Sequence, residues 1–355
     1  MDASFSEDQD LIRSTATAFF RDWAESGALR KLTDQQVCHD TAAWAALAGE
    51  LGFAGLTVPE SAGGAGLGSV ERAILMEEMG KVLFMSPYLG TCVLATDVLA
   101  SVGGKPCEDL LGQIAEGRLT AAFVHLGGTE DKDLSGTAQL VVDAAQADRL
   151  IVAAGGRLLL VDPTQDGVSC QPAQTLDLTR GRGDVVLNRP VYELLAEGSG
   201  VAAALEKARA LSAISLAAEQ VGGAEALLTQ TVAYVMDRKQ FGRPVGSFQA
   251  VKHRCADMMI RVEAARSAVY LAAAVADTDE TALIEHAAIA KSEASEAYFQ
   301  IAGDAIQMHG GVGVTWEYDL HFHFKRARAG KDLLGTPEQW RSVLASHIGL
   351  NEVAA

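Results

Sequence analysis

The sequence predicts a mainly α-helical protein with a β insert in the middle of the chain. Apolar residues recur at helical spacing at both ends, whereas residues 119–189 carry short runs of aliphatic and β-branched residues. Runs of one class of element followed by another favour separate domains over a doubly wound parallel sheet. We therefore expect an α+β protein with a helical domain over residues 1–118, a small β-sheet or barrel domain over 119–195 and a helical bundle over 196–355.

The N-terminal part begins with a helix-start signal. Ser6 and Gln9 stand at the positions of a capping box, and a helical apolar pattern follows them. A second helical segment stops at Gly52, and a third is expected over residues 69–79. The glycine-rich loop between them, residues 58–68, is no phosphate-binding P-loop, because no Gly-Lys-Ser/Thr follows it.

The middle part carries strand-like runs. They are short, mostly separated by Gly, Asp and Pro, and recur at intervals of roughly ten to twenty residues, which predicts a small antiparallel sheet or barrel. The runs lie at residues 121–124, 140–142, 150–153, 158–161 and 185–187.

The C-terminal part returns to long helices, which break at residues 242–244, 277–279 and 309–313. Between the first two breaks, apolar residues alternate spacings of three and four and form a continuous stripe, which is typical of packing in a bundle. The stripe consists of Phe248, Val251, Cys255, Met258, Val262, Ala265 and Val269.

Charge and composition exclude several classes of protein. Lys and Arg number 29 against 46 Asp and Glu, and the net charge of −17 disfavours binding to nucleic acid or anionic lipid. No apolar run reaches the roughly 18 residues of a membrane helix, and the first residues lack the basic start of a signal peptide. The five scattered cysteines form no CxxC pair and argue against a disulfide framework or a zinc site. We expect buried thiols in a cytoplasmic protein without a metal.

The first motif with a chemical meaning covers residues 237–249, Asp-Arg-Lys-Gln-Phe-Gly-Arg-Pro-Val-Gly-Ser-Phe-Gln. Arg238 supplies a forked cation suited to a pyrophosphate, the ring of Phe241 can stack on a flat heterocycle, and Gln249 can bridge polar edges. Taken alone, the motif also fits a helix hairpin with a surface arginine.

The second motif covers residues 307–314, Gln-Met-His-Gly-Gly-Val-Gly-Val. Gly310 and Gly311 shortly follow a helix that ends near Gln307, and glycines there let backbone N–H groups approach a phosphate. Both motifs, with residues 58–64 and Glu77-Glu78-Met79-Gly80, are similar to the acyl-CoA dehydrogenase family over essentially the whole chain.

This resemblance implies a helical N-terminal domain, a middle β domain and a C-terminal four-helix bundle, with FAD shared across a subunit interface. It also implies that one subunit contributes a set of residues to the ADP half of the FAD in its neighbour. Those residues are Arg238, Phe241, Gln249, Gln307, Gly310 and Gly311, and all of them are present.

The residues that would serve the subunit's own flavin ring depart from the family pattern. Where the family usually shows Thr-Glu-Pro and then Gly-Ser-Asp, residues 123–131 read Phe-Val-His-Leu-Gly-Gly-Thr-Glu-Asp. The usual Trp-Ile-Thr-Asn stretch is missing too, because no tryptophan occurs between Trp44 and Trp316. The β insert is also shortened.

The catalytic base is missing as well. Family members remove an α-proton of an acyl thioester while a β-hydrogen leaves as hydride to the flavin, so a carboxylate must face the substrate. By resemblance, its usual position lies 27 residues after Gln307, which is Leu334 here. A second position used by some members, 26 residues before Arg238, is Ser212. The sequence therefore predicts no catalytic residue in this chain.

Other polar residues near these positions are expected to be structural. Asp332 is expected to be solvated, and Glu219 to lie at the surface or in an interface. His321 and His323 stand two residues apart and face different sides of a helix, which argues against a shared metal. For His309, a place beside the phosphate and a capping or packing role both stay open.

The resemblance thus implies the non-catalytic partner in a bacterial α2β2 acyl-CoA dehydrogenase, such as those that oxidise steroid side-chain thioesters. A longer homologue would carry the base and the flavin-ring contacts, an acyl-CoA of unspecified chain would be the substrate, and an electron-transfer flavoprotein would accept the electrons. Two alternatives stay open: a homo-oligomeric flavoenzyme with a non-standard base, and an FAD-free scaffold or acyl-binding protein.

Overall fold

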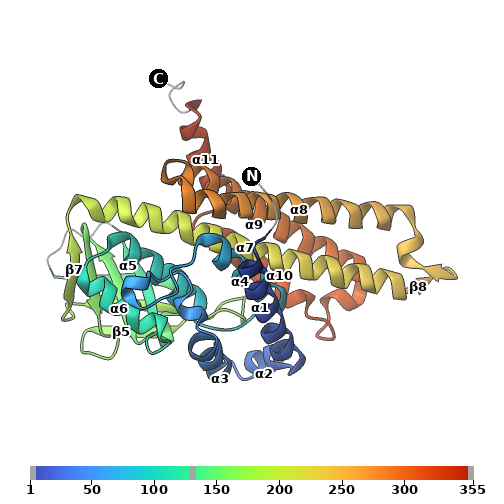
Figure 1. The fold of residues 1–355 in the computed structure, drawn as a ribbon. Coiled ribbons are helices and arrows are strands. Elements are labelled where there is room, and N and C mark those ends of the chain that lie inside the picture. The colour runs from blue at the N-terminus through green and yellow to red at the C-terminus, as the bar shows by residue number, and fades with distance from the viewer. Residues whose placement is uncertain (1–4, 128–132, 351–355) are drawn as a thin grey trace. The chain divides into compact units, whose positions relative to one another are not determined.

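The computed structural model describes residues 5–127 and 133–350 (Figure 1). The chain forms two compact units. The helical unit comprises Met1–Gly27, Ser69–Phe84 and Ala213–Ala355, and the mixed unit comprises Ala28–Gly68 and Met85–Ser212. The predicted fold class, mainly α with a β insert, is confirmed, whereas the three predicted domain boundaries stay a prediction. Within the described residues, no helix combines the length and apolar character needed to cross a membrane.

The described residues of the mixed unit form short helices and seven strands. Its helices are α2 (Ala28–Asp34), α3 (Thr41–Ala45), α5 (Thr96–Val102) and α6 (Lys105–Ala115), with π-helical turns at Ala46–Glu50 and Leu89–Ala95. Its strands are β1 (Ala121–Leu126), β2 (Ser135–Val142), β3 (Arg149–Ala154), β4 (Arg157–Val161), β5 (Val168–Pro172), β6 (Arg182–Asn188) and β7 (Glu193–Glu197).

The strands form two sheets, in the orders β1-β3-β4-β7 and β2-β6-β5. All five predicted runs lie in strands. The expectation of a purely antiparallel sheet is wrong in one place, because β1 and β3 pair in parallel, with Val124 opposite Val152. The chain passes through β2 of the other sheet between them, and such a crossover allows parallel pairing.

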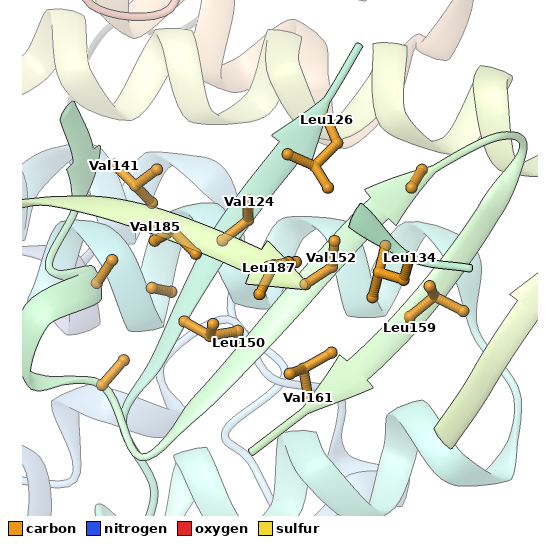
Figure 2. Close-up of a cluster of buried hydrophobic side chains, with 14 residues drawn as sticks. Val124, Leu126, Leu134, Val141, Leu150, Val152, Leu159, Val161, Val185 and Leu187 are labelled. Atoms are coloured by element: carbon orange, nitrogen blue, oxygen red, sulfur yellow. The ribbon is translucent and has the colours of Figure 1, made fainter. Parts of the chain in front are cut away.

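The core of these strands lies between the two sheets (Figure 2). Alternate residues of a strand face the same side, so Val124 and Val152 from one sheet meet Val185 and Leu187 from the other. All four side chains are buried. This packing fixes the position of the end of β1, where the family's flavin-ring residues would stand.

The helical unit is built from long helices. They are α1 (Glu7–Glu25), α4 (Ser69–Val82), α7 (Ser199–Asp237), α8 (Gln249–Thr278), α9 (Leu283–His309), α10 (Leu320–Asp332) and α11 (Pro337–His347). Helix α7 starts in the mixed unit, and its residues from Ala213 onward belong to the helical unit. The predicted capping box is confirmed, since Gln9 N donates to Ser6 Oγ and Ser6 N donates to Gln9 Oε1.

The predicted apolar stripe forms part of the packed face of α8. Met258, Val262, Ala265 and Val269 are buried. The helix ends at Thr278, within the predicted break. The spacing of apolar residues therefore predicted the packed face of this helix, and the polar break at residues 277–279 predicted its end.

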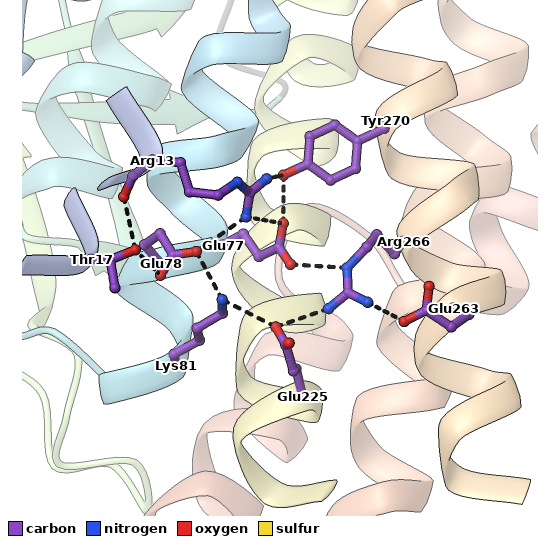
Figure 3. Close-up of polar contacts among 9 residues, drawn as sticks. All are labelled: Arg13, Thr17, Glu77, Glu78, Lys81, Glu225, Glu263, Arg266 and Tyr270. Atoms are coloured by element: carbon purple, nitrogen blue, oxygen red, sulfur yellow. Dashed lines mark hydrogen bonds and ion pairs between the residues drawn. The ribbon is translucent and has the colours of Figure 1, made fainter. Parts of the chain in front are cut away.

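The Glu-Glu pair of α4 belongs to a buried polar network (Figure 3). Glu77 Oε1 accepts from Arg266 Nε at 3.0 Å, and Tyr270 Oη donates to Glu77 Oε2. Arg13 Nη1 lies 3.1 Å from Glu78 Oε1. Burial raises the pKa of Tyr270, which keeps the phenol protonated as a donor. The pair thus joins α1, α4 and α8 and has a structural role.

Candidate functional site

The arginine motif forms a hairpin between two long helices. Helix α7 ends at Asp237, and β8 (Lys239–Gln240) then pairs with β9 (Arg243–Pro244). The predicted break in the helical pattern is confirmed, but the two-stranded β-hairpin of β8 and β9 was not predicted. Arg238 N donates to the carbonyl of Tyr234 at 2.9 Å, and Val245 N donates to the carbonyl of Arg238 at 2.7 Å. The backbone of Arg238 is therefore held at both ends.

Phe241 stands at the tip of the hairpin with an exposed ring and a left-handed backbone conformation. Its side chain is 92% exposed, and its φ of 53° lies in the left-handed region. A non-glycine residue there costs on the order of 1 kcal/mol, and such strain collects at binding sites. Since the ring gains little burial within this chain, a contact with a group outside the chain best accounts for an exposed aromatic ring in this strained position.

The exposed polar side chains of the motif differ in whether they already have a partner within the chain. The Arg243 guanidinium lies 4.0 Å from the centre of the Phe248 ring. Gln249 Nε2 lies 3.0 Å from His253 Nε2. Arg238 is exposed, and no acidic residue of the described part of the chain forms an ion pair with it. Arg238 is thus a cation of this motif that is available to an anion, and Lys239 beside it is exposed too.

The second motif ends α9. Gly310, at φ 64° and ψ −139°, terminates the helix, and its N–H donates to the carbonyl of Gln307. A 3₁₀ turn follows over Gly310–Val314. A Cβ on Gly311 would meet nothing within 4 Å, and its φ lies outside the left-handed region. Nothing within the described ranges requires glycine at 311, so its backbone is open to a group approaching from outside.

The structure brings the two motifs to the same end of the helical unit. Tyr234 Oη, one turn before Arg238, donates to the carbonyl of His309 at 3.2 Å. Arg254 of α8 pairs with Asp304 of α9 at 2.7 Å. A guanidinium, a glycine turn and an exposed ring therefore stand at the same end of the helical unit, and this set of groups suits the pyrophosphate and adenine of an ADP moiety. The residues present fit FAD.

His309 has a structural role. Its side chain is buried, Nδ1 lies 2.8 Å from the carbonyl of Ala305, and its ring stacks on Tyr234 with the centroids 4.2 Å apart. Burial lowers the pKa of this imidazole. Two roles were left open for His309. These contacts fit the capping or packing role and not a place beside the phosphate.

The two usual base positions are occupied by other side chains. Leu334 follows α10 with φ 63°. Ser212 is buried, and its Oγ donates to Asp97 Oδ2 at 2.8 Å within the mixed unit. Asp97 was not singled out from the sequence. A lone carboxylate within the apolar pattern of α5 was the signal that could have identified it.

Other candidate residues are structural, with one correction. Glu219 was expected at the surface or in an interface, but it is buried and pairs with Arg326 at 2.6 Å. Asp332 is exposed, as predicted. His323 is buried, its Nδ1 lies 2.8 Å from Tyr298 Oη, and burial lowers its pKa to about 3. A neutral, enclosed imidazole of this kind belongs to the core.

The stretch that departs from the flavin-ring pattern borders a cavity in the mixed unit. Its residues 128–131 lie outside the described part of the chain. The cavity holds about 290 Å³ and is lined by the end of β1, the β3–β4 turn and the start of α7. The ionisable side chains in its lining are His125 and Arg157. Among the described residues no carboxylate lines the cavity.

Two family descriptions match the chain. "Acyl-CoA dehydrogenase, N-terminal domain" matches residues 6–116, and "Acyl-CoA dehydrogenase, C-terminal domain" matches residues 198–349. The chain belongs to the acyl-CoA dehydrogenase family. The sequence-based resemblance is thereby confirmed. The predicted cofactor, FAD, is named for a solved structure of the same fold, "PigA with FAD and proline".

Related family members cover nearly the whole chain. It is 37% identical over 336 residues to "Acyl-CoA dehydrogenase IpdE2" of Mycolicibacterium smegmatis, covering 94% of this chain and 96% of the relative. It is 36% identical to "Acyl-CoA dehydrogenase FadE34" of Mycobacterium tuberculosis over 342 residues, which cover 94% of this chain and 46% of the relative.

Solved structures of family members share the fold. The chain is 29% identical to "Tcur3481-Tcur3483 steroid ACAD G363A variant", with a TM-score of 0.87 and coverage of 98% of this chain and 99% of the other. It is 26% identical to a chain of the ChsE4-ChsE5 complex from Mycobacterium tuberculosis, with a TM-score of 0.88 and full coverage of both chains.

Proposed function

We propose that this chain is a subunit of an FAD-dependent acyl-CoA dehydrogenase and supplies the ADP clamp to a catalytic partner. The clamp consists of Arg238, Phe241, Gln249, Gln307, Gly310 and Gly311. The observation that carries the proposal is a contrast between two sites. The clamp residues are exposed, whereas Leu334 and Ser212 occupy the positions of the base.

Four of the clamp residues have a defined task in this proposal. The guanidinium of Arg238 binds the pyrophosphate, and the Gly310–Gly311 turn, which carries no side chains, lets the same anion come close to the backbone. The ring of Phe241 packs on a flat heterocycle. FAD, when bound, accepts the hydride in the α,β-desaturation of an acyl-CoA thioester. This chain's residues hold the cofactor and move no proton.

The surface around the clamp supports a protein partner. Several large apolar side chains are exposed on the segments that carry the clamp, namely the end of α7, the hairpin and the residues after α9. They are Val232, Met236, Phe241, Val314, Trp316 and Tyr318. Exposed aromatic and aliphatic side chains of this kind are typical of an interface between subunits, and a partner bound there would also contact the clamp.

The comparisons support a homologous partner. One solved relative is described as the ChsE4-ChsE5 complex, with two differently named components. In FadE34 the matched part is 46% of the chain, so the remainder is long enough to hold a second copy of the fold. We therefore propose an α2β2 assembly with a longer acyl-CoA dehydrogenase. The steroid ACAD among the relatives favours a steroid-derived thioester as substrate, and we take an electron-transfer flavoprotein as the acceptor.

One observation favours the alternative of a non-standard base in this chain. Asp97 places a buried carboxylate 2.8 Å from the hydroxyl of Ser212, at the second base position of the family. A positioned general base contributes roughly 10²- to 10⁴-fold to the rate. If Asp97 had that role, removing its charge would cause a loss of this size.

The Asp97→Asn variant therefore tests the proposal. The amide oxygen that this substitution introduces can still accept the hydrogen bond from Ser212, so the variant removes the charge and keeps this contact. In the complex with the native partner, we expect kcat for acyl-CoA oxidation to stay within about threefold of the original, because the base lies on the partner. A loss of about 100-fold or more in an assembled, FAD-loaded complex would support the alternative.

A further inference from the structure

We propose that Tyr234 is a positioning residue for the clamp. It holds the Arg238 hairpin in a fixed position relative to the Gly310–Gly311 turn. The inference rests on the proposed function, because it concerns the same cofactor site. Tyr234 lies within α7 and is half-buried, so it acts through the residues that it contacts. Neither the hairpin nor the glycine turn contains it.

Tyr234 touches both halves of the clamp through different groups. Its carbonyl accepts from Arg238 N at 2.9 Å, at the point where the hairpin leaves the helix. Its hydroxyl donates to the carbonyl of His309 at 3.2 Å. That carbonyl belongs to the peptide bond that leads into Gly310. One side chain thus ties the last turn of α7 to the last residue of α9.

Three aromatic rings reinforce this connection. The rings of Tyr234 and His309 are stacked, with 4.2 Å between centroids and 20° between planes. The Tyr318 ring packs edge-on against both, at 5.9 Å from Tyr234 and 5.4 Å from His309. His309 is itself fixed by the contact between Nδ1 and the carbonyl of Ala305 at 2.8 Å. The tyrosine therefore packs against a ring with little freedom to move.

The connection matters because the two halves of the clamp stand on separate elements. Arg238 follows α7, whereas Gly310 follows α9. A ligand that contacts both halves binds more tightly when they already stand in the bound arrangement, because less conformational freedom is lost on binding. The stack and the hydrogen bond of Tyr234 provide this arrangement before the cofactor arrives.

The test compares FAD binding by native complexes that contain Tyr234→Leu or Tyr234→Phe. The leucine variant loses the ring stack and the hydroxyl, so we expect the Kd for FAD to rise about tenfold. The phenylalanine variant keeps the stack, and its Kd should stay within about threefold of the original. Flavin fluorescence on titration of the deflavinated complex measures both values.

Tyr270→Phe is the matched control for stability. It also removes a tyrosine hydroxyl from the helical unit, at a position about 30 Å along α8 from Gln249. Tyr270 bonds to Glu77 and Arg13, so the change should lower the unfolding temperature and leave the Kd for FAD unchanged. A Kd that rises in Tyr270→Phe as much as in Tyr234→Leu would show a general effect of destabilisation and overturn the inference.

Arg238→Ala separates the inference from the proposed function. If Arg238→Ala weakens FAD binding while Tyr234→Leu leaves it unchanged, the clamp exists and the positioning role is wrong. If Arg238→Ala itself leaves the Kd unchanged, the proposed function is wrong, and the positioning role falls with it.

Discussion

Replacing Arg238 by alanine is expected to weaken FAD binding by the native complex about 100-fold, since truncating one partner of a desolvated charge pair costs about 2–5 kcal/mol. Arg238 is exposed in the isolated chain, and no acidic residue of the described ranges pairs with it. Its loss should therefore leave the fold unchanged and act on the cofactor. Retained flavin per complex, measured by absorbance after gel filtration, shows the effect.

Arg243→Ala is the matched control for this prediction. Arg243 lies five residues further on, in the same hairpin, and its guanidinium already stacks 4.0 Å from the centre of the Phe248 ring. We expect its removal to change FAD binding much less. Equal losses in the two variants would mean that general positive charge, and not the geometry of Arg238, attracts the cofactor.

Gly222→Ala is expected to lower the free energy of unfolding by about 3 kcal/mol or more, because inserted atoms that meet backbone force helices apart. A Cβ on Gly222 of α7 would lie 1.9 Å from the carbonyl oxygen of Glu77 in α4. One on Gly80 would lie 2.0 Å from the carbonyl oxygen of Glu219. The two helices thus cross in backbone contact, and neither glycine can gain a methyl group without a shift.

Gly303→Ala gives the comparison for this effect within another long helix. A Cβ on Gly303 of α9 would meet nothing within 4 Å, and alanine is the better helix former by up to about 1 kcal/mol. Urea unfolding should therefore show Gly303→Ala at or above the original stability and Gly222→Ala far below it. Similar stabilities for the two variants would contradict the close crossing of α4 and α7.

Much of the fold follows from local signals in the sequence. The capping box at Ser6, the apolar stripe of α8 and the breaks between long helices depend on residues close together in the chain, and each is present. The strands β5 and β7 were missed, because they are short and carry no long apolar run. The parallel pairing of β1 with β3 depends on how the chain crosses between sheets, which strand composition does not encode.

The candidate site was predictable as motifs but not as contacts. Arg238 and Gly310 stand out by residue type and spacing, whereas the role of Tyr234 depends on a hydrogen bond across 75 positions to His309. The hydrogen bond between Asp97 and Ser212 spans 115 positions. Glu219 was placed wrongly, because its partner Arg326 lies 107 positions away. Contacts at such separations come from packing, and one sequence alone does not specify them.

The most direct test of the proposed division of labour is the ratio of FAD to protein in the native complex and in this chain alone. The proposal predicts one FAD per pair of chains in a complex with a longer homologue, and no stoichiometric FAD or acyl-CoA oxidation with this chain by itself. The absorption spectrum and the subunit masses of the tagged, natively assembled protein give both values. One FAD per copy of this chain with activity in isolation, or no flavin in any assembly, would contradict it.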